Sequence, residues 1–173
     1  FNYANALAAV ALAHEAGVPF DSAAMHAMES VHVPGRMELF TGTDGDTVAI
    51  VDYAHNYASV TALLDFVYER WGEENPRITL VTGSAGNKAY DRRQEIVEAA
   101  QDRIARFVFT AEDTDTEPYI DICNEMLGHV TNDHVDATVI VDRVKAIESA
   151  VEQAHSHDGL DVILIIGKGH ERW

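Results

Sequence analysis

Five residues near the end of the chain carry groups that could bind a substrate with both a phosphate and an amine. Residues 167–171 read Gly-Lys-Gly-His-Glu and follow directly on the apolar run 162–166. Such a run predicts a buried strand, and open α/β sheets place their ligands at the carboxyl ends of their strands. The two glycines allow close backbone approach, while Lys168 and Glu171 offer opposite charges. We therefore expect a ligand site after the last strand.

A second polar cluster, Asp-Tyr-Ala-His at 52–55, lies where an expected strand runs into a helix. Asp52 could accept hydrogen bonds from two ribose hydroxyls, and His55 could reach a phosphate. A carboxylate that caps the free amides of the helix start explains the same pattern. Both interpretations stay open at this point.

A third cluster, Gly-Ser-Ala-Gly-Asn-Lys at 83–88, follows another expected strand. It lacks the spacing of a Walker A motif, so the lysine and hydroxyl that hold phosphate and Mg²⁺ are not in place. A glycine-rich loop that opens a helix can still bind an anion through its backbone amides, and Lys88 adds a mobile charge. An ordinary turn with solvated basic residues is the alternative.

A fourth cluster, residues 110–118, concentrates four carboxylates after a strand and could hold a cationic substrate. A solvated acidic turn that caps the next helix is the simpler interpretation from composition alone. None of the nine histidines shows the spacing of a zinc site, so we expect no metal site in this chain.

The elements that must position these clusters follow from the periodicity of the apolar residues. We expect two short helices up to residue 28, then a β-hairpin, then alternating helices and strands. The expected strands are 38–43, 48–53, 78–82, 107–109, 139–141 and 162–166, and the apolar helix faces lie within 60–71, 96–104, 122–127 and 144–154. This order predicts an α/β fold: a mostly parallel sheet with helices on both faces and an antiparallel strand from the hairpin. A break at 33–36 places the boundary between the opening helices and the sheet near residue 37.

Composition narrows the class of protein. The chain has 173 residues, 47% of them hydrophobic, which is enough for one main core. Its 29 acidic and 12 basic residues give a net charge of −17, which repels polyanions and argues against nucleic-acid binding. The single cysteine, Cys123, lies on an apolar helix face and excludes a disulfide framework. Since we find neither a signal peptide nor an apolar run long enough for a membrane span, we expect a cytoplasmic protein. The start at Phe1 suggests a piece of something longer.

Taken together, the motifs resemble the carboxyl-terminal part of Mur ligases. Six motifs occur here in the order found in the family: F-N-x-x-N-A-L-A-A, P-G-R-M-E, D-Y-A-H-N, G-S-A-G-N-K, the acidic loop and G-K-G-H-E. The resemblance covers essentially all 173 positions. G-K-G-H-E is most similar to the members that add the third peptide residue in peptidoglycan synthesis. The resemblance implies that residues 1–37 are the helical end of a central ATPase domain and residues 38–173 a Rossmann-like carboxyl-terminal domain.

The resemblance also implies roles for nucleotide-binding residues. Asn2 and Asn5 match positions that contact adenine, Asp52 matches a ribose contact, and His55 adjoins it. Arg36 matches an arginine that reaches the terminal phosphate, which makes it the expected catalytic residue. ATP and Mg²⁺ are the implied cofactors. The family's Walker A motif, its Mg²⁺ ligands and its carbamylated lysine belong upstream, so we expect this chain to be inactive alone.

Other positions match contacts to the incoming amino acid: Lys88, where many members have an arginine, and Gly167 and Glu171. The informative departure lies in the acidic loop. Members that add diaminopimelate carry D-N-P-R there, whereas Glu112, Asp113, Thr114 and Asp115 stand at those positions, so that Asp115 replaces the arginine. A carboxylate at about 4 Å repels another by a few kcal/mol near a protein surface and attracts an ammonium. We therefore expect a diamino acid with a terminal amine, L-lysine or ornithine.

The activity implied by the resemblance is ATP-dependent, ADP-forming amide ligation to UDP-N-acetylmuramoyl-L-Ala-D-Glu. The implied partners are ATP, this dipeptide substrate, the diamino acid and the remaining domains of the same polypeptide. Three alternatives stay open: another Mur-like ligase with a different amino acid, a non-catalytic module that binds a nucleotide or amino acid, and a structural or interaction domain.

Overall fold

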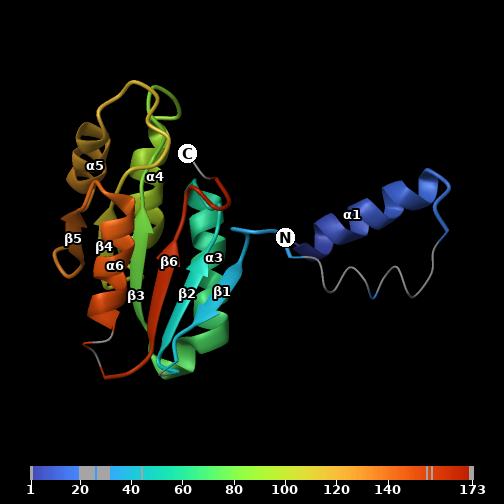
Figure 1. Ribbon diagram of the computed structural model, residues 1–173, viewed down its shortest axis with the longest axis horizontal. Coiled ribbons are helices and arrows are strands. Elements are labelled where there is room, and N and C mark those ends of the chain that lie inside the picture. Colours follow the sequence, from blue (N-terminus) through green and yellow to red (C-terminus); the bar gives the residue numbers. More distant parts are fainter. Residues whose placement is uncertain are drawn as a thin grey trace. The chain divides into compact units, whose positions relative to one another are not determined.

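The chain folds into two compact units, residues Phe1–His32 and Val33–Trp173. The computed structural model describes residues 2–19, 26, 32–43, 45–154, 156 and 158–171 (Figure 1). The first unit contains α1, Asn2–Glu15, which ends where Gly17 adopts a φ of +83° that an L side chain rarely takes. The second expected helix, up to residue 28, lies outside the described residues apart from position 26.

The second unit is built on a six-stranded sheet. Its strands are β1 (Glu38–Thr41), β2 (Thr47–Val51), β3 (Arg77–Thr82), β4 (Arg106–Phe109), β5 (Asp136–Val139) and β6 (Asp161–Ile165). They lie in the order β1-β2-β6-β3-β4-β5, so the last strand of the chain lies between β2 and β3 (Figure 1). β1 pairs with β2 antiparallel, and every other pair is parallel. This confirms the predicted α/β fold.

Helices cover the sheet on both faces. They are α3 (Tyr57–Trp71), followed by the 3₁₀ turn η1 (Gly72–Glu74), α4 (Asp91–Ala100), α5 (Tyr119–Gly128) and α6 (Arg143–Ala154). Apolar residues of α3, α4 and α5 share one core with Val162 and Leu164 of β6. α6 covers the other face, where its alanines pack with Ile163. The alternation along β6 is thus the reason why its continuous apolar run is buried on both sides.

Several element boundaries differ from the expected ones. The hairpin strands are shorter than expected, and α4 ends at Ala100 rather than Ile104. β5 is an edge strand that pairs only with β4. Its bounds, Asp136 to Val139, follow this pairing, from Arg106–Asp136 to Phe109–Val139. Periodicity placed it at the apolar residues 139–141, of which Ile140 packs against the α6 side.

The segment before β1 belongs to the second unit. The backbone N–H of Met37 donates a hydrogen bond of 2.9 Å to Oδ2 of Asp52, at the end of β2. This contact agrees with the division of the chain into units at 32/33, and the expected domain boundary near residue 37 stays a prediction. The assignment of residues 1–37 to a central ATPase domain stays a prediction. In the described part of the chain, no helix is long and apolar enough to cross a membrane.

Candidate functional site

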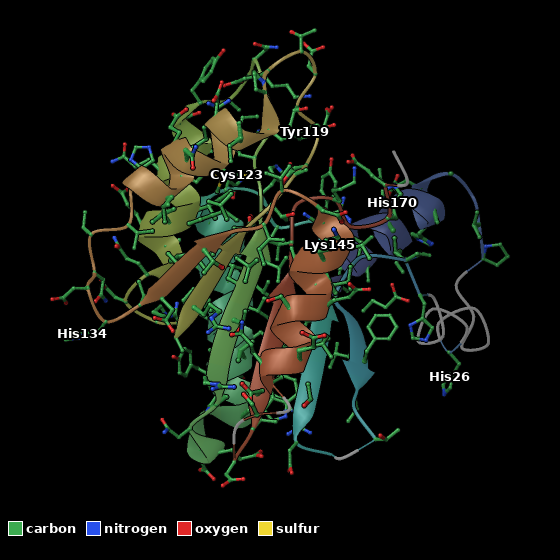
Figure 2. All side chains as sticks on the ribbon, turned by 60° about the vertical axis from the view of Figure 1, so that its left-hand side comes forward. His26, Tyr119, Cys123, His134, Lys145 and His170 are labelled. Carbon is green, nitrogen blue, oxygen red and sulfur yellow. The ribbon has the colours of Figure 1, made fainter. Side chains whose placement is uncertain are left out.

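Five loops meet at the carboxyl edge of the sheet, and we call this set of loops the rim. Four follow the parallel strands β2, β3, β4 and β6, at 52–56, 83–90, 110–118 and 166–171. The fifth, 33–37, precedes β1; because β1 is antiparallel to β2, with Glu38 opposite Val51, its start lies at the same edge. Figure 2 shows Tyr119, after the β4 loop, and His170, in the β6 loop, toward this end of the sheet, whereas His134 lies away from them.

Two rim loops touch through their glycines. A Cβ atom on Gly35 would overlap the backbone of Gly169 and His170, and a Cβ on Gly169 would lie 2.8 Å from the carbonyl oxygen of Gly35. Both glycines also have positive φ, +66° and +48°. Only glycine fits this contact, so the loop that carries Arg36 and the loop that carries Glu171 are held together by their backbones.

Tyr53 lies between these two loops. The guanidinium carbon of Arg36 is 4.3 Å from the centre of the Tyr53 ring, within the range of a cation–π interaction. The Tyr53 hydroxyl donates a 2.9 Å hydrogen bond to Oε1 of Glu171. That hydrogen bond, followed by burial and the charges of Glu171 and Glu112, raises the pKa of Tyr53 above its usual 10.0, against the lowering effect of Arg36.

Asp52 and His55 are already engaged by the backbone of their own loops. Oδ1 and Oδ2 of Asp52 accept hydrogen bonds from the N–H groups of Ala54 and Met37, at 2.8 and 2.9 Å. Nδ1 of His55 lies 2.7 Å from the carbonyl oxygen of Tyr53. Because a carbonyl only accepts, Nδ1 carries a proton, and Nε2 of the neutral ring is left as an acceptor.

The helix after this loop does not need Asp52 as a cap. Asn56 caps α3: its side chain accepts from the N–H of Ser59, whose hydroxyl accepts from the N–H of Asn56 in turn. Asp52 therefore orders the rim rather than the helix start. Each of its oxygens keeps a second lone pair, which is compatible with hydroxyl donors from a ribose.

The β3 loop and the acidic β4 loop are joined along their length. Nζ of Lys88 lies 3.0 Å from Oδ2 of Asp113, and this exposed pair raises the pKa of Lys88 and lowers that of Asp113. The side chain of Asn87 donates to Asp115 at 3.2 Å. A Cβ on Gly86 would overlap the carbonyl of Thr114. The two loops thus bring Lys88, Asp113 and Asp115 together.

The acidic loop is also held by a buried arginine. The guanidinium of Arg93, on α4, donates to both carboxylate oxygens of Glu117 and to Glu125, and to the carbonyl of Ala85 at 3.2 Å. Pro118 precedes α5 without any side-chain cap, so the carboxylates of the loop do not cap that helix. Glu117 therefore has a structural role, and the interpretation of the cluster as a helix cap does not hold.

Glu112 is the most unusual carboxylate of the rim. Its Oε2 is buried and has no hydrogen-bond partner in the described part of the chain. Burial is the main reason why its pKa rises to about 7; Glu171 and Asp113 also raise it, while Arg143 and Lys168 lower it. Gly167 packs against this oxygen so closely that a Cβ there would overlap it, and its φ is +97°.

Arg143, the first residue of α6, ties the β4 and β6 loops together. Its guanidinium donates to the carbonyl of Ala111 at 3.2 Å and to that of Ile166 at 2.8 Å. Burial lowers its pKa, and the charge of Glu112 opposes that shift. An arginine at a helix N-terminus is electrostatically unfavourable, and this could have drawn attention to it in the sequence.

The structure brings nine of the predicted site residues to one edge of the second unit: Arg36, Asp52, His55, Lys88, Glu112, Asp113, Asp115, Gly167 and Glu171. Asn2 and Asn5 lie on α1 in the first unit; the side chain of Asn2 is not described, and that of Asn5 is exposed. Sequence reasoning missed Tyr53, Arg93 and Arg143 as site residues. The described residues include no group of three or more acidic, histidine or cysteine side chains that could hold a metal ion.

A mostly parallel sheet with basic and acidic loops at its carboxyl edge has these loops where α/β domains commonly place their ligands. Comparison with known families specifies the class further: the family described as "Mur ligase, glutamate ligase domain" matches residues 35–169. The chain therefore belongs to the Mur ligase family.

Curated relatives cover the whole chain. The UDP-N-acetylmuramyl-tripeptide synthetase of Bifidobacterium longum is 69% identical over 175 residues, which take in 100% of this chain and 34% of that protein. The UDP-N-acetylmuramoyl-L-alanyl-D-glutamate--L-lysine ligase of Enterococcus faecalis is 37% identical over 171 residues, 98% of this chain and 32% of that protein. The chain thus spans about a third of the length of these relatives.

Solved structures share the fold. A UDP-N-acetylmuramoyl-L-alanyl-D-glutamate--2,6-diaminopimelate ligase superposes with a TM-score of 0.68 and 27% identity, over 99% of this chain and 34% of the other. The alanine ligase MurC of Thermotoga maritima has a TM-score of 0.62 at 23% identity, over 96% and 34% of the two chains, and shows the fold alone.

Proposed function

We propose that this chain is the carboxyl-terminal domain of an ATP-dependent, ADP-forming ligase that adds L-lysine to UDP-N-acetylmuramoyl-L-Ala-D-Glu. The observation that carries the proposal is the convergence of a cationic and an anionic group on one tyrosine: Arg36 over its ring and Glu171 at its hydroxyl. The cation suits a phosphate, and the carboxylate suits an amine. The match to tripeptide synthetases over the full chain supports the same reaction class.

The acidic loop favours a diamino acid that ends in an ammonium. Glu112, Asp113 and Asp115 lie on this loop, and the resemblance to the family implies that Asp115 takes the place of an arginine in diaminopimelate-adding members. A second carboxylate on the substrate would meet like charges there, whereas an ammonium would be attracted. The name of the Enterococcus faecalis relative, a lysine ligase, agrees with this choice.

In the proposed reaction, ATP supplies the phosphoryl group that activates the dipeptide carboxylate, and Mg²⁺ is held by residues outside this chain. Arg36 has no ion pair in the described part of the chain, so its charge is available to a phosphate oxygen. Asp52 and His55 retain acceptor sites for a ribose. The carboxylates of the β4 and β6 loops orient the amine. Such positioning of reactants can lower a barrier by several kcal/mol.

The experiment that tests this function is an ADP-release assay on the full-length protein. Turnover should require ATP, the UDP-muramoyl-dipeptide and lysine together, and the 173-residue chain alone should give none. Lysine-dependent ADP release without the UDP-dipeptide, or none with all three substrates, would contradict the proposed reaction. Binding of ATP or lysine by the full-length protein without any turnover would favour a non-catalytic module.

A further inference from the structure

We propose that Tyr53 is a positioning residue that couples Arg36 to Glu171, so that phosphate binding at one and amine binding at the other are energetically linked. The inference rests on the proposed function and adds to it a residue that the sequence pattern did not single out. Nucleotide and amino acid bind through different loops, and Tyr53 is the side chain that contacts both.

The two contacts use different parts of the same side chain. The ring face receives the guanidinium of Arg36, with 4.3 Å between the guanidinium carbon and the ring centre. The hydroxyl donates to Oε1 of Glu171 at 2.9 Å. Because ring and hydroxyl can be removed separately by mutation, the two halves of the coupling can be measured separately.

The hydroxyl fixes the carboxylate in one orientation. The phenol is protonated at neutral pH, and therefore a donor, because a tyrosine has an ordinary pKa of 10.0 and the hydrogen bond to Glu171 raises the pKa of Tyr53 further. Oε1 of Glu171 is thus occupied, while Oε2 has no hydrogen-bond partner in the described residues and remains available to an amine. A rotation of the ring would change the direction in which this free oxygen points.

The surroundings of Tyr53 leave little room for such a rotation unless the loops also move. A Cβ on Gly169 would lie 2.9 Å from Cδ2 and 3.1 Å from Cβ of Tyr53, so this side chain packs close to the backbone of the β6 loop. The ring of His55 packs edge-on against it at 5.3 Å. A displacement of Arg36 on binding a phosphate therefore reaches Glu171 through one rigid side chain.

The expected signature is reciprocal coupling. If nucleotide binding orders the Arg36 and Tyr53 pair, it also orders Glu171 and raises the affinity for the amino acid by some factor. The bound amino acid must then raise the affinity for the nucleotide by the same factor. Removal of the hydroxyl should abolish this factor and leave nucleotide binding itself nearly intact.

The test compares three full-length proteins: wild type, Tyr53→Phe and Tyr53→Leu. For each, KM for ATP is measured at saturating and at limiting amino acid, and KM for the amino acid at saturating and at limiting ATP. Tyr53→Phe should raise KM for the amino acid by about 5- to 10-fold, the size of one hydrogen bond to a charged group, and leave KM for ATP within about twofold. Its amino-acid KM should no longer depend on ATP. Tyr53→Leu should raise KM for ATP as well.

Tyr68→Phe is the matched control. Tyr68 also donates its hydroxyl, to the carbonyl of Arg103, and also lies under a guanidinium, at 5.2 Å, but on α3 away from the rim. It should leave both KM values unchanged. If Tyr68→Phe moves them as much as Tyr53→Phe does, the role is merely structural and the inference is overturned.

The inference is also overturned if Tyr53→Phe leaves both KM values within twofold, or raises both by the same factor. Should Tyr53→Leu fail to fold, the phenylalanine variant decides the question alone. Wild-type protein that ligates no diamino acid refutes the proposed function and this inference together. Wild-type activity with an unchanged Tyr53→Phe variant refutes only the coupling.

Discussion

A carboxylate oxygen that is buried without a hydrogen-bond partner usually costs stability, and Oε2 of the partly buried Glu112 is such an atom. Burial penalises its charged form and raises its pKa to about 7, from 4.5. The positive charges of Arg143 and Lys168 lower the pKa of Glu112 without cancelling the effect of burial. A ligand ammonium beside Gly167 would form an ion pair with Glu112. This ion pair would compensate the cost of its poorly solvated charge.

Glu112→Gln should stabilise the chain at pH 8 and have little effect near pH 5. A carboxyl with a raised pKa binds its proton more tightly in the folded state, so the free energy of unfolding falls as pH rises from about 4.5 to about 7 and stays low above it. A rise of the pKa from 4.5 to about 7 corresponds to at most about 3.4 kcal/mol. Thermal unfolding of both chains between pH 5 and pH 8 measures the difference.

Glu69→Gln, at an exposed carboxylate of α3, is the control and should give a difference that does not vary with pH. A Glu112→Gln variant that is no more stable than wild type at pH 8, or equally more stable at every pH, would show that the burial penalty is absent.

At the scale of elements, the rim depends on backbones that touch. Gly35, Gly83 and Gly86 each have a backbone atom of another loop where a Cβ would be. These contacts exclude every residue but glycine more strictly than turn geometry alone does. They also explain why the loops that follow separate strands act as one surface.

Gly35→Ala should destabilise the chain by at least about 2 kcal/mol, because it combines a positive φ with overlap against the backbone of the β6 loop. Urea denaturation measures this loss. Gly128→Ala is the control: no atom lies within 4 Å of a Cβ there, and the residue ends α5, so the change should be neutral or slightly stabilising. A loss below about 0.5 kcal/mol for Gly35→Ala would mean that the two loops separate easily.

Periodicity predicted the elements well where burial is continuous, as in β6, and less well at the edge strand β5, whose bounds depend on pairing with β4. Arg93 falls on the apolar face of its helix, at helical spacing from Ile96, Val97 and Ala100, and this spacing could have predicted a buried arginine. No spacing could have predicted the contacts of Tyr53, because its two partners are distant in the sequence.

At the scale of the whole molecule, the insertion of β6 between β2 and β3 brings both ends of the second unit to the same place. The loop before β1 and the loop after β6 are far apart in sequence, yet their glycines touch. A site built in this way needs the complete sheet, and the order of the strands depends on pairing between segments that are distant in the sequence. The acidic loop 110–118 contributes four of the 29 acidic residues behind the net charge of −17, so most of the negative charge lies outside this loop.

The most direct test of the account is the ratio of kcat/KM for L-lysine to that for meso-diaminopimelate in the full-length protein. Under the proposed function, the carboxylates of the acidic loop attract a terminal ammonium and repel a distal carboxylate. We expect lysine to be preferred by at least about tenfold, which corresponds to about 1.4 kcal/mol of discrimination. A preference for diaminopimelate would contradict the assignment of this rim to a terminal amine.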